Sequence, residues 1–297
     1  MVAVTAKSME LWENTRLEED DYPFQLFFNR NDNALPGQTI LFLHWHEHHE
    51  IIVMEQGSAV FHIDSERCEV RQGDVLFVPA GALHVGYSQV EGPVAYVSLV
   101  YNPSLYQDRI GDLHHDSLIA PYLEGSIRLP VQPSWLSASG HSRIIGQIIH
   151  EARLKRDAYR LMIKTMLYQL LLLLAREQLS MPASGGRKEP SAANRERFKP
   201  LIVEIEQNYA NKWTVAEAAG MVGLSPYHFC KTFKKLTGRT FVEYIHLCRM
   251  NEAERLLADT DWTVTEIAVA VGCDNPNYFT KLFKLYKGEA PSQFRGK

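Results

Sequence analysis

Cysteine is scarce in this chain, and its spacing excludes two common structural uses. Only four cysteines occur among 297 residues, and no two of them form a Cys-x-x-Cys pair. A zinc knuckle needs such closely spaced thiols, and a disulfide scaffold needs a higher density of cysteine. The sequence therefore predicts that neither a cysteine zinc site nor a disulfide framework holds the fold together.

Long hydrophobic runs are missing as well. The first 16 residues contain no apolar core of the length that a secretory signal needs. The longest apolar run, residues 170–175 with its flanks, falls well short of the roughly 20 residues that span a bilayer. We therefore expect a soluble, cytoplasmic protein with no membrane partner.

Positive charge is lacking overall but not locally. The net charge is −4 at pH 7, yet residues 181–297 carry 17 Lys and Arg against 13 Asp and Glu, whereas the rest of the chain carries 14 against 22. Because the charge near a binding face matters more than the total, the C-terminal part is the better candidate for nucleic acid. Residues 181–195 mix Gly, Ser, Pro and charge without an apolar period, which predicts a flexible linker.

The C-terminal third contains the same helical module twice, because residues 214–238 recur at residues 263–288. In the first copy Thr214 can cap a helix, Gly223 can end it, and Ser225 followed by proline can start the next. The three-residue turn between them is typical of a helix-turn-helix. Two copies are too few for a solenoid, so the repeat predicts two recognition units.

The second helix of each module divides into an apolar face and a basic, partly aromatic face. The apolar positions are Phe229, Phe233 and Leu236 in the first copy and Phe279, Phe283 and Tyr286 in the second. The opposite face suits DNA, because lysine neutralises phosphate and donates to guanine, and asparagine can pair with adenine. An ordinary solvated face is the alternative, but it gives no reason for the pattern to recur in register.

Within the basic face, Lys231 and Lys281 lie nearest the centre and are expected to contact bases. The lysines toward the sides are expected to contact phosphate; these are Lys234, Lys235 and Lys284. The full set of predicted DNA-binding residues is Ser225, Tyr227, Cys230, Lys231, Lys234, Lys235, Asn277, Thr280, Lys281 and Lys284. Between the modules, residues 242–257 are predicted to form one helix that acts as a rigid spacer.

The N-terminal part has a different pattern. Residues 22–135 contain short apolar or alternating runs broken by glycine and charge, which are typical of a β-sandwich or small barrel. His44 and His46 are two residues apart, so both can enter a barrel from one strand. Glu50 follows them, and His84 follows a Pro-Ala-Gly turn.

Two segments of the chain resemble a known family. GLSPYHFCKTFKKLTG, the helix after it and the second module are similar to the C-terminal DNA-binding domain of AraC-type (AraC/XylS) transcription regulators, over residues 196–297. Residues 44–84 resemble the two motifs of the cupin barrel, the N-terminal sensor domain of many such regulators. The resemblance implies an α+β multidomain chain. Its parts are a cupin-like β-barrel or sandwich for effector binding at residues 1–140, a helical dimerisation segment at residues 141–180, the linker, and an all-α domain with two helix-turn-helix motifs.

The resemblance offers two uses for the polar residues of the cupin-like motifs. In metal-binding cupins the matching residues are the ligands, and three imidazoles with a carboxylate suit a divalent ion; here they are His44, His46, Glu50 and His84. The alternative is that they pack at the barrel mouth or hydrogen-bond an organic ligand. We prefer this alternative in a regulator, because a shared fold does not transfer chemistry. We therefore predict no cofactor and a small-molecule effector, a carbohydrate by resemblance to the family. The predicted effector site consists of His44, Trp45, His46, Glu50, His84 and Tyr87.

Residues 141–179 are predicted to form two helices. The second has a broad apolar face made of Leu161, Met162, Met166, Leu170, Leu173 and Leu174. Such a face either packs on the protein's own barrel or forms a seam between two copies of the chain. The resemblance implies a homodimer interface here.

The sequence therefore predicts a sequence-specific transcription regulator, an activator, with double-stranded promoter DNA and RNA polymerase as partners and no catalytic residues. A metal-dependent cupin enzyme with an accessory helix-turn-helix module is the competing hypothesis, and bound metal together with turnover would distinguish it. An RNA-binding or architectural DNA-binding protein is a third hypothesis. It leaves the cupin-like motifs unexplained.

Overall fold

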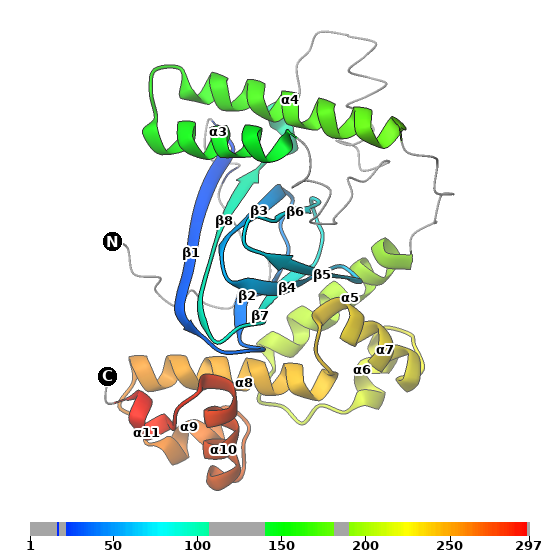
Figure 1. Ribbon diagram of the computed structural model, residues 1–297. Helices are drawn as coiled ribbons and strands as arrows, with labels where there is room; N and C mark the ends of the chain where they lie inside the picture. Colours follow the sequence, from blue (N-terminus) through cyan, green and yellow to red (C-terminus); the bar gives the residue numbers. More distant parts are fainter. Residues whose placement is uncertain (1–16, 18–21, 107–139, 181–189, 296–297) are drawn as a thin grey trace.

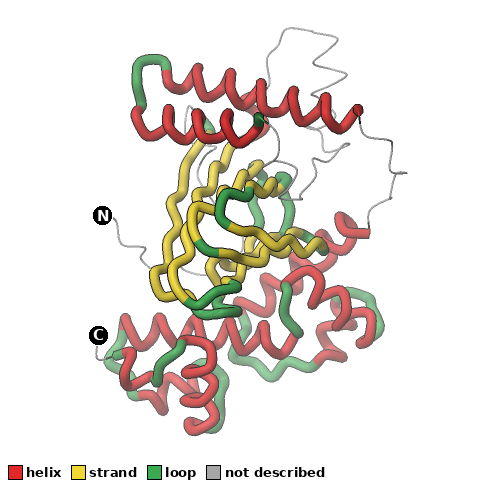
Figure 2. Tube along the Cα trace, viewed as in Figure 1, coloured by secondary structure: helices red, strands yellow, loops and turns green. Residues whose placement is uncertain are grey.

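The computed structural model describes residue 17 and residues 22–106, 140–180 and 190–295. A β-rich domain lies between a pair of helices, α3 (His141–Leu154) and α4 (Tyr159–Ser180), and a larger helical domain (Figures 1 and 2). Strands occupy the N-terminal part and helix-turn-helix modules the C-terminal part, so the predicted α+β organisation is confirmed.

The β-rich domain consists of two antiparallel sheets with strand orders β1-β8-β3-β6 and β2-β7-β4-β5. The strands are β1 Phe24–Ala34, β2 Thr39–His44, β3 His49–Gln56, β4 Ser58–Ile63, β5 Glu66–Arg71, β6 Val75–Val78, β7 His84–Ser88 and β8 Gly92–Tyr101, followed by the short helix η1 Pro103–Tyr106. Alternate residues of a strand point to opposite faces of its sheet. Phe61, Val70 and Leu76 point to the inner faces of the two sheets and belong to one buried apolar cluster between them.

The other face of the β1-β8-β3-β6 sheet is covered by α3 and α4. Ile51, Phe77 and Leu99 on this face share one apolar cluster with Ile148 of α3 and Leu167 of α4. Much of the apolar surface that the sequence places on these two helices therefore packs against the protein's own sheet.

The helical domain consists of α5 Pro190–Gln207, α6 Val215–Met221, α7 Pro226–Thr237, α8 Phe241–Asp259, α9 Val264–Ala270, α10 Pro276–Lys287 and α11 Pro291–Phe294. α8 is the predicted spacer helix. Its first half, with Tyr244 and Cys248, packs into the core of the first module, and its second half, with Ala253 and Leu257, packs into the core of the second. The two modules consequently lie at opposite ends of α8 (Figure 1).

Local sequence sets the ends of the helices in both modules. Thr214 and Thr263 each form a capping box with the glutamate three residues later, at the start of α6 and α9. Gly223 and Gly272 follow these helices with φ of 60° and 75°, a conformation that favours glycine. Ser225 caps α7, as predicted.

The predicted flexible linker is partly helical. α5 begins at Pro190, so residues 190–195 belong to this helix, because proline is favoured at a first helical position and the alanines after it favour helix. Residues 181–189 lie outside the described part of the chain. Within the described residues, no helix is long and apolar enough to cross a membrane.

Candidate functional site

α7, the second helix of the first module, presents the face predicted to bind DNA. Its N-terminus is capped by Ser225, whose hydroxyl accepts a hydrogen bond from the backbone N–H of His228 at 3.5 Å. Phe229 and Phe233 are fully buried, while Tyr227 on the opposite side is 72% exposed. The remaining predicted residues of this helix are all exposed, namely Cys230, Lys231, Lys234 and Lys235.

α10 repeats this division in the second module. Phe279 and Phe283 are fully buried, and Tyr286 is half-buried with its hydroxyl donating to the backbone carbonyl of Glu243 at 3.1 Å. Thr280 is half-buried, and its hydroxyl donates to the backbone carbonyl four residues earlier, so this side chain is tied to its own helix. The other predicted residues are exposed, namely Asn277, Lys281 and Lys284.

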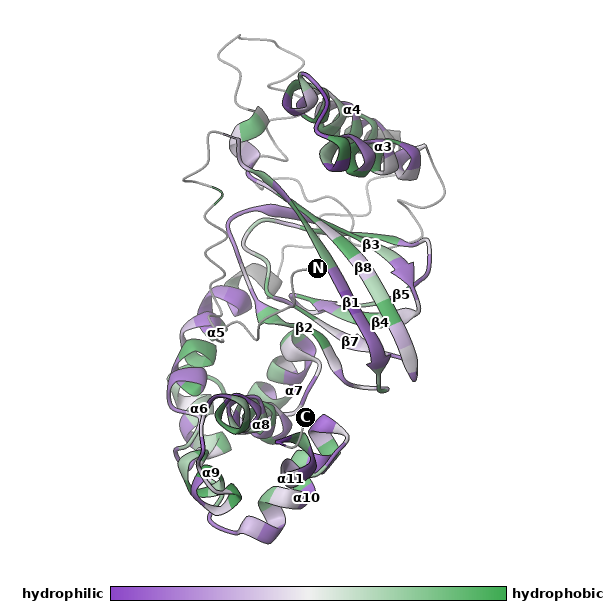
Figure 3. Cartoon of the chain, turned by 90° about the vertical axis from the view of Figure 1, so that its left-hand side faces the viewer, coloured by the Kyte–Doolittle hydropathy of each residue, from purple (hydrophilic) through white to green (hydrophobic). Residues whose placement is uncertain are grey.

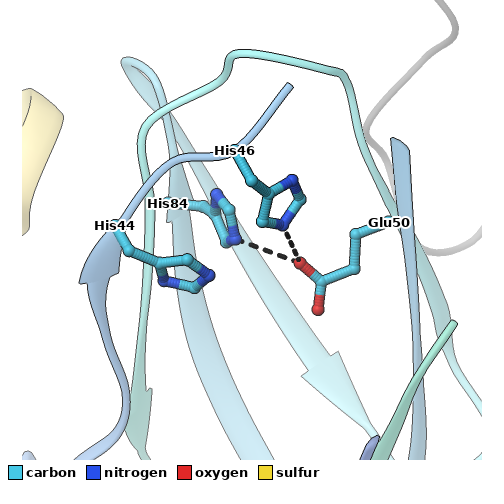
Figure 4. Close-up of side chains that lie close together, drawn as sticks. All are labelled: His44, His46, Glu50 and His84. Carbon is cyan, nitrogen blue, oxygen red and sulfur yellow. Dashed lines mark hydrogen bonds and ion pairs between the residues drawn. The ribbon is translucent and has the colours of Figure 1, made fainter. Parts of the chain in front are cut away.

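Four polar side chains of the β-rich domain converge inside the sandwich (Figure 4). His44 ends β2, His46 follows it, Glu50 lies on β3 and His84 begins β7. One nitrogen or oxygen of each lies within 4.8 Å of those of the others, and none of the four residues is more than 6% exposed. Pairing of β2 with β7 places His44 directly opposite His84. We call these four residues the histidine cluster.

Hydrogen bonds fix how the rings of the histidine cluster are turned. Nδ1 of each histidine donates to a backbone carbonyl two residues away, at 2.8 Å for His44, 3.1 Å for His46 and 2.9 Å for His84. The Nε2 atoms of His46 and His84 lie 3.3 and 3.0 Å from the same Oε2 atom of Glu50. The His84 contact is at ion-pair distance, but its geometry is not that of a hydrogen bond, and Nε2 of that ring has no other hydrogen-bond partner among the described residues.

Electrostatics favour an uncharged ring at His44 and an ionised carboxylate at Glu50. Burial, and next the neighbouring ring of His84, hold the pKa of His44 well below its usual range. Burial alone would raise the pKa of Glu50, but the adjacent imidazoles of His46 and His84 outweigh burial and lower that pKa well below its usual range. Three imidazoles around a carboxylate are a donor set that suits a divalent transition-metal ion. Two ligands on opposite sides of such an ion are about 4 Å apart, which is close to the spread of the cluster, so the four residues fit one ion.

Trp45 and Tyr87, expected in the same effector site, lie on the opposite face of their strands. Both share an apolar cluster with Phe198 of the helical domain. The Lys199 ammonium lies 5.1 Å from the centre of the Trp45 ring, and the Tyr87 hydroxyl donates to the backbone carbonyl of Thr237 at 2.6 Å. The six residues predicted for the effector site therefore do not converge: four lie inside the sandwich and two outside it, because adjacent residues of a strand point to opposite faces.

Sequence reasoning missed a direct contact between the two domains. In the turn after β4, Asp64 accepts a hydrogen bond from Arg195 of α5 at 3.0 Å, and both side chains are largely buried. After α7, the Arg239 guanidinium lies 4.4 Å from the centre of the Tyr87 ring and donates to the carbonyl of Gly37 at 2.5 Å. No local pattern signals these contacts, because the partners are more than 100 residues apart in the sequence.

Comparison with known proteins assigns both domains. Residues 32–171 match the model of the AraC-like ligand binding domain, and residues 218–297 match that of a helix-turn-helix domain. The chain belongs to the AraC-type transcription regulators. As a member of this family it is a DNA-binding transcription regulator rather than an enzyme, and the hypothesis of a metal-dependent cupin enzyme is set aside.

Several curated relatives of this AraC-type regulator span both of its domains. The uncharacterized HTH-type transcriptional regulator YdeC of Bacillus subtilis is 24% identical over 96% of this chain and 95% of its own length. The HTH-type transcriptional activator RhaR of Klebsiella pneumoniae is 25% identical, over 87% of this chain and 88% of its own. The bifunctional transcriptional activator/DNA repair enzyme AdaA of Bacillus subtilis is 42% identical, but over only 32% of this chain and 46% of its own.

Proposed function

We propose that this regulator activates transcription by binding promoter DNA with both helix-turn-helix modules, under the control of an effector sensed by the β-rich domain. The relatives RhaR and AdaA are named as transcriptional activators, which supports activation over repression. An activator acts on RNA polymerase, which is therefore the proposed protein partner. The proposed place of action is the cytoplasm, where promoter DNA lies.

The observation that carries this proposal is a pair of matching basic helices at the two ends of one rigid helix. α7 and α10 both expose lysines and bury phenylalanines, and α8 joins their modules. α8 has 19 residues and is therefore about 28 Å long. Successive major grooves on one side of B-DNA are about 34 Å apart, so one chain can present both helices to neighbouring grooves.

The effector is proposed to bind within the β-rich domain. The family resemblance implies a carbohydrate effector, which would pack against flat aromatic rings. Trp45 and Tyr87, the aromatic residues expected for this role, pack against the helical domain instead. Of the six residues predicted for the effector site, the four that lie inside the sandwich are those of the histidine cluster. The structure therefore favours an effector that is recognised by nitrogen and carboxylate donors.

Two lysine variants test the proposed DNA-binding faces. A duplex enriched from a random pool by the full-length protein serves as the probe. Lys231→Ala and Lys281→Ala should each weaken binding by about 1–3 kcal/mol and relax base preference at a few positions, because each removes a base contact. Lys284→Ala should instead lower the slope of log affinity against log salt by about 1, as loss of one phosphate contact does.

Fluorescence anisotropy at several salt concentrations measures these changes. Arg143→Ala, which removes an exposed positive charge from α3 in the sensor part of the chain, is the matched control and should change neither quantity. Unchanged affinity in both Lys231→Ala and Lys281→Ala would contradict the proposed faces.

A further inference from the structure

The two helix-turn-helix modules touch each other directly beside α8. The connection between α5 and α6, residues 208–214, belongs to the first module, yet it reaches the second. Tyr209 packs against the apolar cores of both modules. The next residue, Ala210, approaches Gly272 so closely that a Cβ atom at position 272 would lie 2.2 Å from the Ala210 carbonyl oxygen. The two modules therefore meet backbone to backbone, and a side chain at position 272 would force them apart.

Arg249 lies at the centre of this contact. It is half-buried near the middle of α8, where the helix passes from the first core to the second. Its guanidinium donates to the backbone carbonyls of Tyr209 and Asn211, each at 2.9 Å. A longer bond reaches the carbonyl of Ala210 at 3.5 Å. Because the donors of a guanidinium form a rigid planar fork, three carbonyl acceptors hold the connection in one position against α8.

The same guanidinium also faces the second module. Burial raises the pKa of the Cys273 thiol, and the nearby Arg249 guanidinium offsets part of this rise. Cys273 directly follows Gly272 in the turn between α9 and α10. One side chain of α8 therefore lies between the connection of the first module and the turn of the second.

Other contacts hold α10 along the first half of α8. The Tyr286 hydroxyl donates to the backbone carbonyl of Glu243 at 3.1 Å, and the Tyr278 ring lies 6.2 Å from the ring of His246. These contacts do not involve Arg249. Loss of Arg249 should therefore loosen the second module without detaching it.

We propose that Arg249 is a positioning residue that fixes the distance and rotation between α7 and α10, so that the protein accepts only one spacing between its two DNA segments. Since both modules must read DNA for spacing to matter, this inference rests on the proposed function. The modules have separate apolar cores on α8, so their mutual rotation depends on the contacts beside that helix. With residues 209–211 held by Arg249, α7 and α10 move as one body.

A fixed pair of recognition helices discriminates between spacings because DNA is itself a helix. One inserted base pair moves a DNA segment by about 3.4 Å along the axis and turns it by roughly 35°. A rigidly held α10 cannot follow this displacement, so its base contacts are lost. A loosely held α10 can follow part of it and keeps some of these contacts.

Duplexes of altered spacing test the proposal. The probes are the duplex enriched from a random pool by the full-length protein and two copies whose segments are one base pair closer or farther apart. In fluorescence anisotropy the wild type should bind the original spacing at least about tenfold more tightly, which is the loss expected from one base contact. Arg249→Met, which keeps an unbranched stem and removes the donors, should lower this ratio to about threefold or less. Equal binding of all three duplexes by the wild type would overturn the proposal.

The ratio between spacings is a readout that a general loss of stability does not move, because such a loss weakens binding to all three duplexes alike. Arg255→Met is the matched control on the same helix. Arg255 is exposed and donates to Glu252 and Asp259 within α8, so its loss should leave the ratio unchanged. Arg249→Gln keeps amide donors on a shorter stem and should give an intermediate ratio. It replaces Arg249→Met if circular dichroism shows that variant to be unfolded. An unchanged ratio in the folded Arg249 variant would contradict the positioning role.

A distance measurement without DNA tests the same role. Cys230 on α7 is exposed, whereas the other three cysteines are buried. Thr265→Cys adds an exposed labelling position on α9, so a spin label on each module reports the distance between them. The distribution of distances should be narrow with Arg249 present and at least about twofold wider in Arg249→Met. Equal widths, or a broad distribution with Arg249 present, would overturn the proposal.

The outcomes distinguish this inference from the proposed function. Failure to enrich any duplex would contradict DNA binding by the two modules, while the label distances would still test Arg249. Enrichment of a duplex with two segments, followed by an Arg249→Met ratio equal to that of the wild type, would overturn the positioning role and leave the proposed function standing.

Discussion

At the scale of single residues, Glu206 near the end of α5 is a half-buried acid next to the core of the first module. Its carboxylate accepts a hydrogen bond from the Tyr244 hydroxyl at 2.6 Å. Burial raises the pKa of Glu206 from 4.5 to about 8, and the hydrogen bond from Tyr244 offsets only part of this. The folded protein therefore keeps a proton on Glu206 at pH values where the unfolded chain has released it.

This difference predicts how stability changes with pH. Between the unfolded pKa and the folded pKa the native state binds the extra proton, so the free energy of unfolding falls as pH rises from about 5 to about 8. Glu206→Gln, which stays neutral and can still accept the hydrogen bond, should remove this part of the slope. Urea denaturation of both proteins across this pH range measures it, and equal slopes would show that Glu206 does not carry the effect.

Single residues also show what the sequence could and could not predict. The two-residue spacing of His44 and His46 correctly placed both inside the sandwich. The same alternation places Trp45 and Tyr87 on the other face, but we grouped them with the histidines by chemistry rather than by strand geometry. The role of Arg239 had no sequence signal at all, because its partners belong to distant strands.

At the scale of secondary-structure elements, the helix-turn-helix modules were predicted closely because their signals are local. Caps, turn glycines and the period of the apolar residues all lie within one module, and the structure reproduces each of them. The sheet order β1-β8-β3-β6 has no such signal, since neighbouring strands are separated by long stretches of sequence. The start of α5 at Pro190 was missed because glycine and charge nearby outweighed a short helical pattern.

A prediction at the same scale concerns the helix pair α3 and α4, which we expect to form a homodimer interface. Leu170 and Leu174 are buried against the protein's own sheet, but Leu161 and Met162 are 63% and 53% exposed. Apolar residues lie along α4 in Figure 3. The apolar surface of this helix therefore exceeds what its own domain covers, which supports a partner of the same sequence.

Leu161→Asp should weaken this association, because a charge buried at an apolar seam loses its hydration. Sedimentation at micromolar concentration should show a dimer for the wild type and a shift toward monomer for the variant. Met221→Asp replaces a similarly exposed apolar residue in the helical domain and should leave the dimer intact. A monomeric wild type would contradict the seam.

At the scale of the whole molecule, the two domains share one apolar cluster rather than meeting through a flexible connection. Side chains of β2 and β7 and of α5, α7 and α8 belong to it together, and the Asp64–Arg195 ion pair and the Tyr87–Thr237 hydrogen bond lie in the same interface. The sensor domain therefore packs directly against the first module. The second module is connected to the rest of the described structure mainly through α8. This asymmetry predicts that effector signals act first on the module containing α7.

The central claim is that one chain reads two neighbouring sites with α7 and α10, and selection of DNA from a random pool by the full-length protein tests it most directly. The enriched sequences should contain two short conserved segments with centres about 10 base pairs apart, one helical turn of B-DNA. Selection with Lys281→Ala should relax one segment and leave the other, and Lys231→Ala should do the reverse. A pool that shows no enrichment, or a single segment unaffected by either variant, would contradict the account.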